Sequence, residues 1–376
     1  MRENRCHGIN ILRIVTIFIF FILLLSIFIS PLYSEQDLKD NITPLLKYRL
    51  PKNVELCGER IPIERPEIYE RLDLEFLLFL GNEAQIILWL KRSKKFFPYI
   101  EERLKEEEMP DDLKYIPVVE SSLRNDAVSR KGAAGTWQFI PETSKRYGLT
   151  KNRSIDERFD FFKATEGALA YLRELYDQFG SWILAMAAYN CGEERLSKEI
   201  KEQGVNNYFN LYLPRETERY VFRIAAIKLI LSNPERYGFI IDEADFYPPL
   251  KFQTIVIKVK YPIHLRLIAE AANTYFKNIK ELNPQIRGYY LPAGKQLLRI
   301  PPGDLDKFIK KYKRITRLKK KKGKKHYYRV KSGDTLYSIA SKLNISTKEL
   351  IKYNHIKKGK KLKKGKVLVY YKYIIE

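Results

Sequence analysis

Apolar positions in the middle of the chain follow the spacing of helices. From about Glu75 to Asn233, apolar residues recur at intervals of three and four, as in "KATEGALAYLRELYDQFG" (163–180). A further run of this kind, "ERYVFRIAAIKLILSN" (218–233), ends before Pro234, a residue that cannot continue a helix. The pattern predicts a largely helical domain over this part of the chain.

The pattern changes after residue 250. "FQTIVIKVK" (252–260) is rich in β-branched residues and typical of a strand, and the helical pattern "HLRLIAEAANTY" (264–275) follows it. The same succession returns 71 residues later, so that "LPAGKQLLRI" (291–300) matches "LKKGKVLVYY" (362–371). We expect two copies of a small strand–helix–helix–strand unit. Between them, "KKYKRITRLKKKKGKK" (310–325) predicts a solvated cationic tether.

The N-terminus has the pattern of an export signal. Arginines precede an uncharged apolar stretch at 14–30, and Pro31 follows it. The stretch is at the lower limit for spanning a bilayer, and residues 32 and 33 could extend it. Because no clean cleavage site follows, we favour an uncleaved inner-membrane anchor over a removed signal peptide. With the arginines in the cytoplasm, everything after residue 34 would lie outside it.

The charge of the chain is concentrated at its C-terminal end. The net charge is +24, and residues 304–376 carry 25 Lys and Arg against 5 Asp and Glu, which leaves about +4 for the rest. A basic tail can attract nucleic acid, anionic lipid or another polyanion. Because no recognition motif accompanies the charge, we expect no nucleic-acid partner.

The three cysteines indicate little. Cys6 precedes the apolar stretch, whereas Cys57 and Cys191 would both be exported. Those two could pair, but sequence cannot establish that they meet. No spacing of metal ligands is present, and we expect neither a metal nor a cofactor.

One acid stands in an apolar stripe. On a helix, Glu120 would share a face with Leu113, Ile116 and Leu123. Desolvation there would raise its pKa and keep a proton on it near neutral pH, as general-acid cleavage of a glycosidic bond requires. The alternative is a structural Glu that is satisfied by an arginine or by backbone amides. Pro117 is expected to kink the helix.

A loop of small residues follows this acid. "KGAAGTWQ" (131–138) lets backbone approach a ligand closely. Gln138 offers an amide, Trp137 a flat apolar surface and Ser129 a hydroxyl, which together suit a sugar ring. Each also has an ordinary structural interpretation, with Trp137 in the core and Ser129 in a turn.

Three ordered blocks resemble a known family. "ESSLRNDAVSRKGAAGTWQFIP" (120–141), "AAYNCGEERL" (187–196) and "PRETERYV" (214–221) are similar to motifs of lytic transglycosylases, which cut peptidoglycan and have a goose-type-lysozyme-like (SLT) fold. "YYRVKSGDTLYSIASKLNISTKELIKYN" (327–354) resembles LysM, a module that binds N-acetylglucosamine-containing glycans. The earlier copy looks like a degenerate LysM without the Ser-Gly-Asp-Thr turn, so its sugar binding is doubtful. This order of domains resembles that of membrane-bound members of the family.

The resemblance implies a mainly α fold, with a lysozyme-like helical catalytic domain followed by two small α+β LysM-like modules. The expected divisions are a signal or anchor (1–34), a polar segment (35–74), the catalytic domain (75–245), a degenerate LysM-like module (252–303), a basic linker (304–325) and a LysM domain (326–372).

The resemblance also implies roles for individual residues. Glu120 would be the catalytic acid and base, and Glu216 a structural partner. Substrate binding would fall to Ser129, Gln138, Tyr189, Asn190 and Tyr220, and glycan binding by LysM to Ser332, Gly333, Asp334 and Thr335. Cys191 stands where relatives usually have a smaller residue, and we expect no loss of activity from it.

The implied reaction uses one carboxyl group to cleave the bond between N-acetylmuramic acid and N-acetylglucosamine without water, leaving a 1,6-anhydro end. Ordinary glycosidases use two carboxylates. The alternatives are a lysozyme-type hydrolase and a non-catalytic wall-binding scaffold. The expected partners are peptidoglycan strands, the membrane through residues 14–33, and anionic wall polymers or lipids through the basic end. No cysteine closely follows the apolar stretch, which argues against a lipid anchor in the envelope.

Overall fold

The computed structural model describes residues 48–318, 325–343, 347–356 and 362–371. The chain divides into two compact units, Met1–Pro51 and Lys52–Glu376, and the second contains everything discussed below. None of the helices within the described ranges is long and apolar enough to cross a bilayer. The predicted anchor at 14–33 lies outside those ranges.

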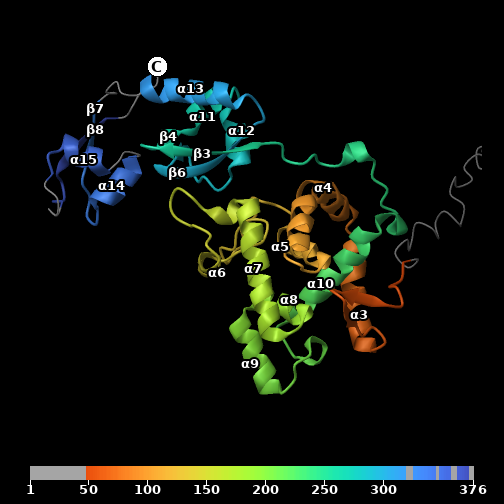
Figure 1. Ribbon diagram of the computed structural model, residues 1–376. Helices are drawn as coiled ribbons and strands as arrows, with labels where there is room; N and C mark the ends of the chain where they lie inside the picture. Colours follow the sequence, from red (N-terminus) through yellow and green to blue (C-terminus); the bar gives the residue numbers. More distant parts are fainter. Residues whose placement is uncertain (1–47, 319–324, 344–346, 357–361, 372–376) are drawn as a thin grey trace, which may run out of the picture. The chain divides into compact units, whose positions relative to one another are not determined.

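The first part of the second unit is helical (Figure 1). A short hairpin of β1 (Val54–Leu56) and β2 (Glu59–Ile61) precedes it. The helices are α3 (Pro66–Leu80), α4 (Glu83–Glu106), α5 (Ile116–Ser121), α6 (Pro141–Arg146), α7 (Phe161–Phe179), α8 (Trp182–Cys191), α9 (Glu193–Gln203) and α10 (Arg215–Ser232). Short 3-10 turns lie between them at Asp111–Tyr115, Glu157–Phe159 and Tyr208–Asn210, and two more follow α10 at Pro234–Tyr237 and Glu243–Asp245.

Local sequence accounts for where the central helices begin and end. The Asp160 side chain accepts a hydrogen bond from the Lys163 amide at the start of α7, and Ser181 does the same for Leu184 in α8. Gly180 and Gly192 follow the two helices with positive φ values of 66° and 89°. Such a conformation costs glycine little and ends a helix.

Helix α8 is the centre of the helical domain. All of its residues from Trp182 to Ala188 are buried, so it is apolar on every side. It packs between α7 and α10, and α10 in turn packs along α3. Because α5 also contacts α10, the short helix that carries Glu120 is held against the core. This arrangement confirms the helical domain expected from the apolar spacing.

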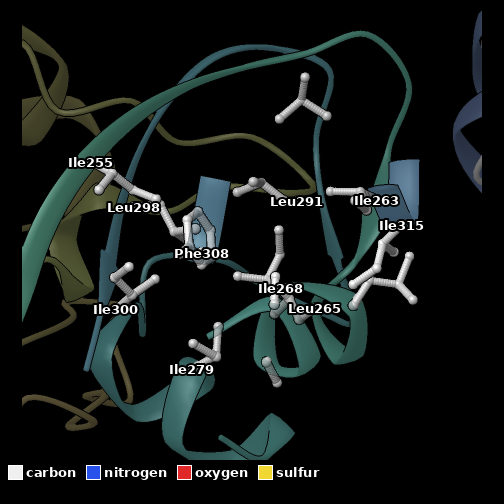
Figure 2. Close-up of a cluster of buried hydrophobic side chains, with 14 of the residues drawn as sticks. Ile255, Ile263, Leu265, Ile268, Ile279, Leu291, Leu298, Ile300, Phe308 and Ile315 are labelled. Atoms are coloured by element: carbon white, nitrogen blue, oxygen red, sulfur yellow. The ribbon is translucent and has the colours of Figure 1, made fainter. Parts of the chain in front are cut away.

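The next part is a small α+β module. Strand β3 (Gln253–Val259) pairs antiparallel with β6 (Gly294–Ile300), and β4 (Ile263–His264) pairs with β5 (Tyr290–Leu291). Helices α11 (Leu265–Ala271) and α12 (Phe276–Leu282) lie between the strands in sequence. Their buried side chains form one cluster with those of the strands (Figure 2).

The second copy repeats this module. Strand β7 (Lys325–Arg329) pairs antiparallel with β8 (Val367–Tyr371), and helices α14 (Leu336–Leu343) and α15 (Thr347–Tyr353) lie between them. Both helices begin 71 residues after their counterparts in the first module. The repeat predicted from the sequence is therefore confirmed, and so is the fold class of a mainly helical domain with two small α+β modules.

One asparagine in each module makes the same set of hydrogen bonds, which supports the structural equivalence of the two modules. In the first module Asn283 donates to the Ile279 and Arg299 carbonyls and accepts from the Arg299 amide. In the second, Asn354 makes the same three bonds, with Leu350 and Val369 as partners. Each asparagine thus ties the end of the second helix to the last strand.

The expected tether between the modules differs from what the structure contains. Residues Leu305–Leu318 form helix α13, which packs against α11 (Figure 1). Its Phe308 and Ile315 are buried in the cluster of the first module (Figure 2). The prediction of a solvated tether is therefore wrong as far as residue 318, because a sparse apolar stripe was hidden among lysines. Residues 319–324 lie outside the described ranges.

Candidate active site

Glu120 is near the end of a short helix that is fixed at both ends. Pro117 stands in the first turn of α5, where a proline costs no hydrogen bond. The stretch expected to be one helix is divided just before this proline, into the 3-10 turn Asp111–Tyr115 and α5. The helix ends at Ser121, and Ser122 and Leu123 have φ values of 55° and 56°. Leu123 is buried but lies beyond the helix, so the single helical face predicted for Glu120 is only partly correct.

The Glu120 carboxyl group meets one phenol. The hydroxyl of Tyr220, a buried residue of α10, donates to Glu120 Oε1 over 2.5 Å. Desolvation raises the pKa of Glu120 to about 7, and the Tyr220 hydrogen bond opposes that rise. The residue as a whole keeps some accessible surface although its carboxyl group is desolvated. A proton donor that must touch substrate needs this combination.

Within the described ranges, no cation neutralises the Glu120 carboxylate. Among the residues that the structure describes, neither arginine nor lysine pairs with Glu120, so the alternative of a structural Glu held by an arginine is not what the geometry shows. The negative charge of Glu216, an exposed residue one turn before Tyr220 on α10, raises the Glu120 pKa further. Glu216 was expected to be a structural partner, and its effect here is electrostatic.

The loop after α5, residues 127–139, is a compact double turn that we call the active-site loop. Isolated bridges join Val128 to Ala134 and Ala134 to Phe139. Ser129 accepts a hydrogen bond from the Ala133 amide at 3.0 Å, which is the turn role that stood as the alternative to substrate binding. The Gln138 amide donates to the carbonyls of Gly135 and Ala127.

Trp137 belongs to the core. Its side chain is fully buried, and its indole N–H donates to Thr165 of α7 over 2.9 Å. A flat surface for a sugar ring, as the sequence suggested, is therefore ruled out for this side chain, and the core interpretation is correct. Its backbone carbonyl accepts from the Tyr189 hydroxyl at 2.8 Å. Trp137 thus anchors the active-site loop to α7 and α8.

The two remaining predicted residues lie at the end of α8. Burial raises the pKa of Tyr189 well above its usual range, and the charge of Glu120 is the next cause, which places the phenol close to the carboxylate. Asn190 accepts a hydrogen bond from the Thr217 hydroxyl at 2.9 Å. The structure therefore brings Glu120, Tyr189 and Tyr220 together, with Asn190 fixing the end of α8 to the start of α10.

Sequence reasoning assigned no role to three residues that position these groups. Ser121 donates to the Thr136 carbonyl at 2.8 Å and so joins α5 to the active-site loop. The Thr217 hydroxyl donates to Asn190. Arg158 donates to a backbone carbonyl of the active-site loop. Ser121 and Thr217 lie within the quoted motifs and could have been singled out there, whereas nothing near Arg158 in the sequence signals its role.

The other acids near the motif have structural surroundings. Asp156 is buried against Arg158, and Glu157 pairs with Lys163. Asp126 and Glu142 are exposed. No group of three or more His, Cys, Asp or Glu in the described ranges could hold a metal ion. Cys57 and Cys191 are both free thiols.

A cavity of about 500 Å³ lies elsewhere, between α4 and α7. Its lining includes Glu107, Met109, Glu166 and Arg173 and none of the residues discussed above. Three of its four carboxylates pair with arginines: Glu107 and Glu166 with Arg103, and Glu174 with Arg146. We therefore place the chemistry at Glu120 and not in this cavity.

The predicted glycan-binding turn of the second module is well formed. Asp334 accepts hydrogen bonds from the Lys331 amide and the Tyr328 hydroxyl, and the first of these lowers its pKa most. Thr335 and Ser338 cap helix α14 by bonding to each other's amides. Ser332 and Gly333 are exposed at the tip of the turn. In the first module, 71 residues earlier, Tyr261 to His264 replace this sequence.

Comparison with family models identifies three parts of the chain. Residues 97–211 match the transglycosylase SLT domain, and residues 328–369 match the LysM domain. Residues 253–317 match the LysM-like domain of lytic transglycosylase MltD. That last range includes most of α13, in agreement with the packing of this helix on the first module.

Curated and solved relatives are similar over different lengths. The chain is 32% identical over 325 residues to membrane-bound lytic murein transglycosylase D of Escherichia coli (strain K12), an alignment that covers 83% of this chain and 71% of the relative. Lytic transglycosylase Slt of Pseudomonas aeruginosa, solved as an inactive mutant, matches with 23% identity, a TM-score of 0.30 and coverage of 40% and 26%. The 70 kDa soluble lytic transglycosylase of Escherichia coli matches with 16% identity, a TM-score of 0.34 and coverage of 55% and 42%.

Proposed function

The chain belongs to the membrane-bound lytic murein transglycosylase D family, and we propose that Glu120 is the single carboxyl group with which it cleaves the glycan strands of peptidoglycan. The protein is a lytic transglycosylase with a catalytic SLT domain and LysM modules that suit it to its polymeric substrate. The observation that carries the assignment to Glu120 is the environment of its carboxyl group, which is desolvated, accepts a hydrogen bond from a buried phenol and pairs with no cation in the part of the chain that the structure describes.

The first step is protonation of the leaving oxygen. With its pKa raised to about 7, Glu120 keeps its proton over much of the neutral range and can pass it to the oxygen that links N-acetylmuramic acid to N-acetylglucosamine. Tyr220 occupies Oε1, so Oε2 is the atom that faces the substrate. The 2-acetamido carbonyl of the N-acetylmuramic acid stabilises the positive charge that develops at the anomeric carbon of the same sugar.

The second step reverses the role of Glu120. Once Glu120 is ionised, the hydrogen bond from Tyr220 stabilises its carboxylate, which is why this bond lowers the Glu120 pKa. The carboxylate then takes the proton of the C6 hydroxyl, whose oxygen attacks the anomeric carbon and closes a 1,6-anhydro ring. The nucleophile is part of the substrate, so intramolecular positioning replaces a bound water.

The surroundings of Glu120 support a route with one carboxylate. A conventional glycosidase needs a second acid across the scissile bond. Asp156 is committed to Arg158, and Glu216 acts by raising the pKa of the first acid. Hydrolysis by water, the lysozyme-type alternative, would leave a reducing end in place of the anhydro ring.

The residues around Glu120 bind and orient the glycan. Tyr189 and Tyr220 line the site beside the Glu120 carboxyl group. Asn190 holds the end of α8, which carries Tyr189, against the start of α10 through its hydrogen bond with Thr217. Ser129 and Gln138 belong to the active-site loop, where their side chains set the positions of backbone carbonyls and amides. In this assignment the loop presents its backbone to the sugar edges.

The LysM domain supplies binding to the wall. Its exposed turn at Ser332–Thr335 takes the N-acetylglucosamine-containing strand, and the lysines around it add attraction to anionic wall polymers or lipid head groups. The enzyme acts in the cell envelope, and residues 14–33 anchor it in the inner membrane. Linking a wall-binding module to the catalytic domain raises the concentration of substrate at Glu120.

Mass spectrometry of the products tests the reaction. Purified wall digested by the full chain should yield fragments lighter than hydrolytic products by the mass of one water. The E120Q variant keeps the shape of the side chain but cannot donate the proton, so it should bind wall normally and release nothing. The matched control is E216Q, which replaces an exposed acid of the same site and should remain active. Products with reducing ends would establish hydrolysis, and lysis by E120Q would point to another acid.

A further inference from the structure

The first LysM-like module contacts a short segment of the catalytic domain. Residues 154–162, which we call the docking segment, run from the loop after α6 into the first turn of α7 and meet the module partly through their backbone. The Asp156 amide donates to the Gln285 carbonyl, and the Arg287 amide donates to the Ser154 carbonyl, each over 2.8 Å. Ile155 and Ile286 form the β-bridge between these two bonds, and Ile155 packs on the core of the module.

A buried ion pair lies at the centre of this contact. The Arg299 guanidinium donates two hydrogen bonds to Asp160, of 2.9 and 2.8 Å, and the two side chains are 7% and 1% exposed. The same guanidinium lies 4.5 Å from the ring centre of Phe162. Without this partner, the Asp160 carboxylate would be a buried charge with neither a counter-ion nor water, which is energetically costly. The ion pair therefore stabilises the contact between the module and the docking segment.

This contact is specific to the first module. Arg299 is the residue whose backbone bonds to Asn283, and the residue in that role in the second module is Val369. The spacing of 71 residues would instead match Arg299 with Tyr370. Neither can form an ion pair. The first module also has Tyr261 to His264 where the second has its glycan-binding turn.

The docking segment leads directly to the active-site loop. Arg158 forms a bidentate pair with Asp156, and its remaining nitrogen donates to the carbonyls of Gly132 and Phe139, at 2.7 and 2.9 Å. Those carbonyls belong to the two ends of the tight turn that contains Gln138. The fit is close, since a Cβ built on Gly135 would lie 1.8 Å from the Arg158 carbonyl oxygen.

We propose that the first LysM-like module serves as a docked support for the active site: Arg299 and the Ile286 bridge fix the docking segment, and Arg158 holds the active-site loop in the position that Glu120 needs. Arg299 and Arg158 are positioning residues, and neither touches the substrate. This module lacks the glycan-binding turn of the second module and has, at other residues, an interface with the catalytic domain. The consequence for turnover depends on the proposed role of Glu120, but the docking itself does not.

Hydrogen exchange of the full chain, without substrate, tests the docking. In R299M, amides of both the docking segment and the active-site loop should exchange roughly tenfold faster or more, because both lose their support. R266M is the matched control, since Arg266 is an exposed arginine on α11 of the same module, and it should exchange like the parent protein. E120Q should accelerate exchange in neither segment, which separates this test from the assignment of the catalytic acid.

Steady-state kinetics on soluble wall fragments give the second readout. Misplacement of the loop by R299M should lower kcat roughly ten- to a hundredfold while KM changes little, and R299K should lie between R299M and the parent protein. Faster exchange confined to the docking segment, or an unchanged kcat in R299M, would overturn the proposal. Should R299M fail to fold, the same comparison between R299K and R266K decides: faster exchange of the loop in R299K supports the proposal, and unchanged exchange refutes it.

Discussion

Replacing Glu120 by Gln should stabilise the catalytic domain at neutral and alkaline pH while it abolishes turnover. The Glu120 pKa rises from an ordinary 4.5 to about 7 because the folded protein desolvates the carboxyl group. One pKa unit corresponds to roughly 1.4 kcal/mol, so ionisation of this side chain costs the folded state about 3 kcal/mol. Glutamine fills the same space, accepts the Tyr220 hydrogen bond and carries no charge.

The pH dependence of this gain follows from linkage. Below about pH 4.5 the carboxyl group is protonated in both folded and unfolded chains, and the variant gains nothing. Between about pH 4.5 and 7 the unfolded chain releases the proton first, so the parent protein loses stability progressively. Above about pH 7 both states are ionised, and the full difference of about 3 kcal/mol remains.

Denaturant unfolding followed by tryptophan fluorescence measures this difference in the right domain. The chain has three tryptophans, Trp89, Trp137 and Trp182, and all of them belong to the helical domain. E120Q and the parent protein should unfold alike at pH 4 and differ increasingly up to pH 8. E216Q, which removes an exposed charge, should show a much smaller change. A constant difference at every pH, or an E120Q variant that is less stable at pH 8, would refute the reasoning.

Three further predictions follow from the same geometry. In Y220F the Glu120 carboxylate loses the hydrogen bond that lowers its pKa, so the alkaline limb of the kcat/KM profile should move to higher pH and kcat should fall roughly tenfold; an unmoved limb would show that the phenol does not act on the acid. G135A should destabilise the catalytic domain by about 2 kcal/mol or more, because Gly135 has a φ of 80° and a Cβ there would overlap the Arg158 carbonyl oxygen; tryptophan fluorescence in denaturant measures this, and a neutral variant would contradict it. Deletion of residues 326–376 should weaken sedimentation with insoluble wall without changing the cleavage of soluble fragments; equal binding by the shortened protein would exclude a role for the LysM domain.

The sequence predicted the elements whose signals are local or repeated. The apolar spacing identified the long helices, and the offset of 71 residues identified two modules whose helices do begin 71 residues apart. Glu120 could be found because a single acid in an apolar stripe is unusual and because the surrounding motif has a specific spacing. The resemblance also named Tyr220, but the local spacing around Glu120 could not indicate that the hydroxyl of this residue, on a helix 100 residues later in the chain, donates to the carboxyl group.

Two predictions failed because a side chain type is compatible with more than one environment. Trp137 suited a sugar ring as well as a core, and only the position of Thr165 on α7, which accepts its N–H, decides for the core. Residues 305–318 appeared to belong to a solvated tether because six of these fourteen residues are Lys or Arg. Phe308 and Ile315, seven residues apart, suffice to bury one face of α13 on the first module.

The support for the active-site loop lies beyond what the sequence alone could indicate, for a physical reason. Arg158 and Arg299 are two among many basic residues, and no local pattern distinguishes an arginine that will be buried from one that faces solvent. Their partners, Asp156 and Asp160, are themselves ordinary loop acids. Burial creates the energetic importance of each pair, because desolvated charges cannot be left unpaired. Arg158 is buried against the active-site loop and Arg299 against the docking segment, so these residues become recognisable only once the tertiary contacts are known.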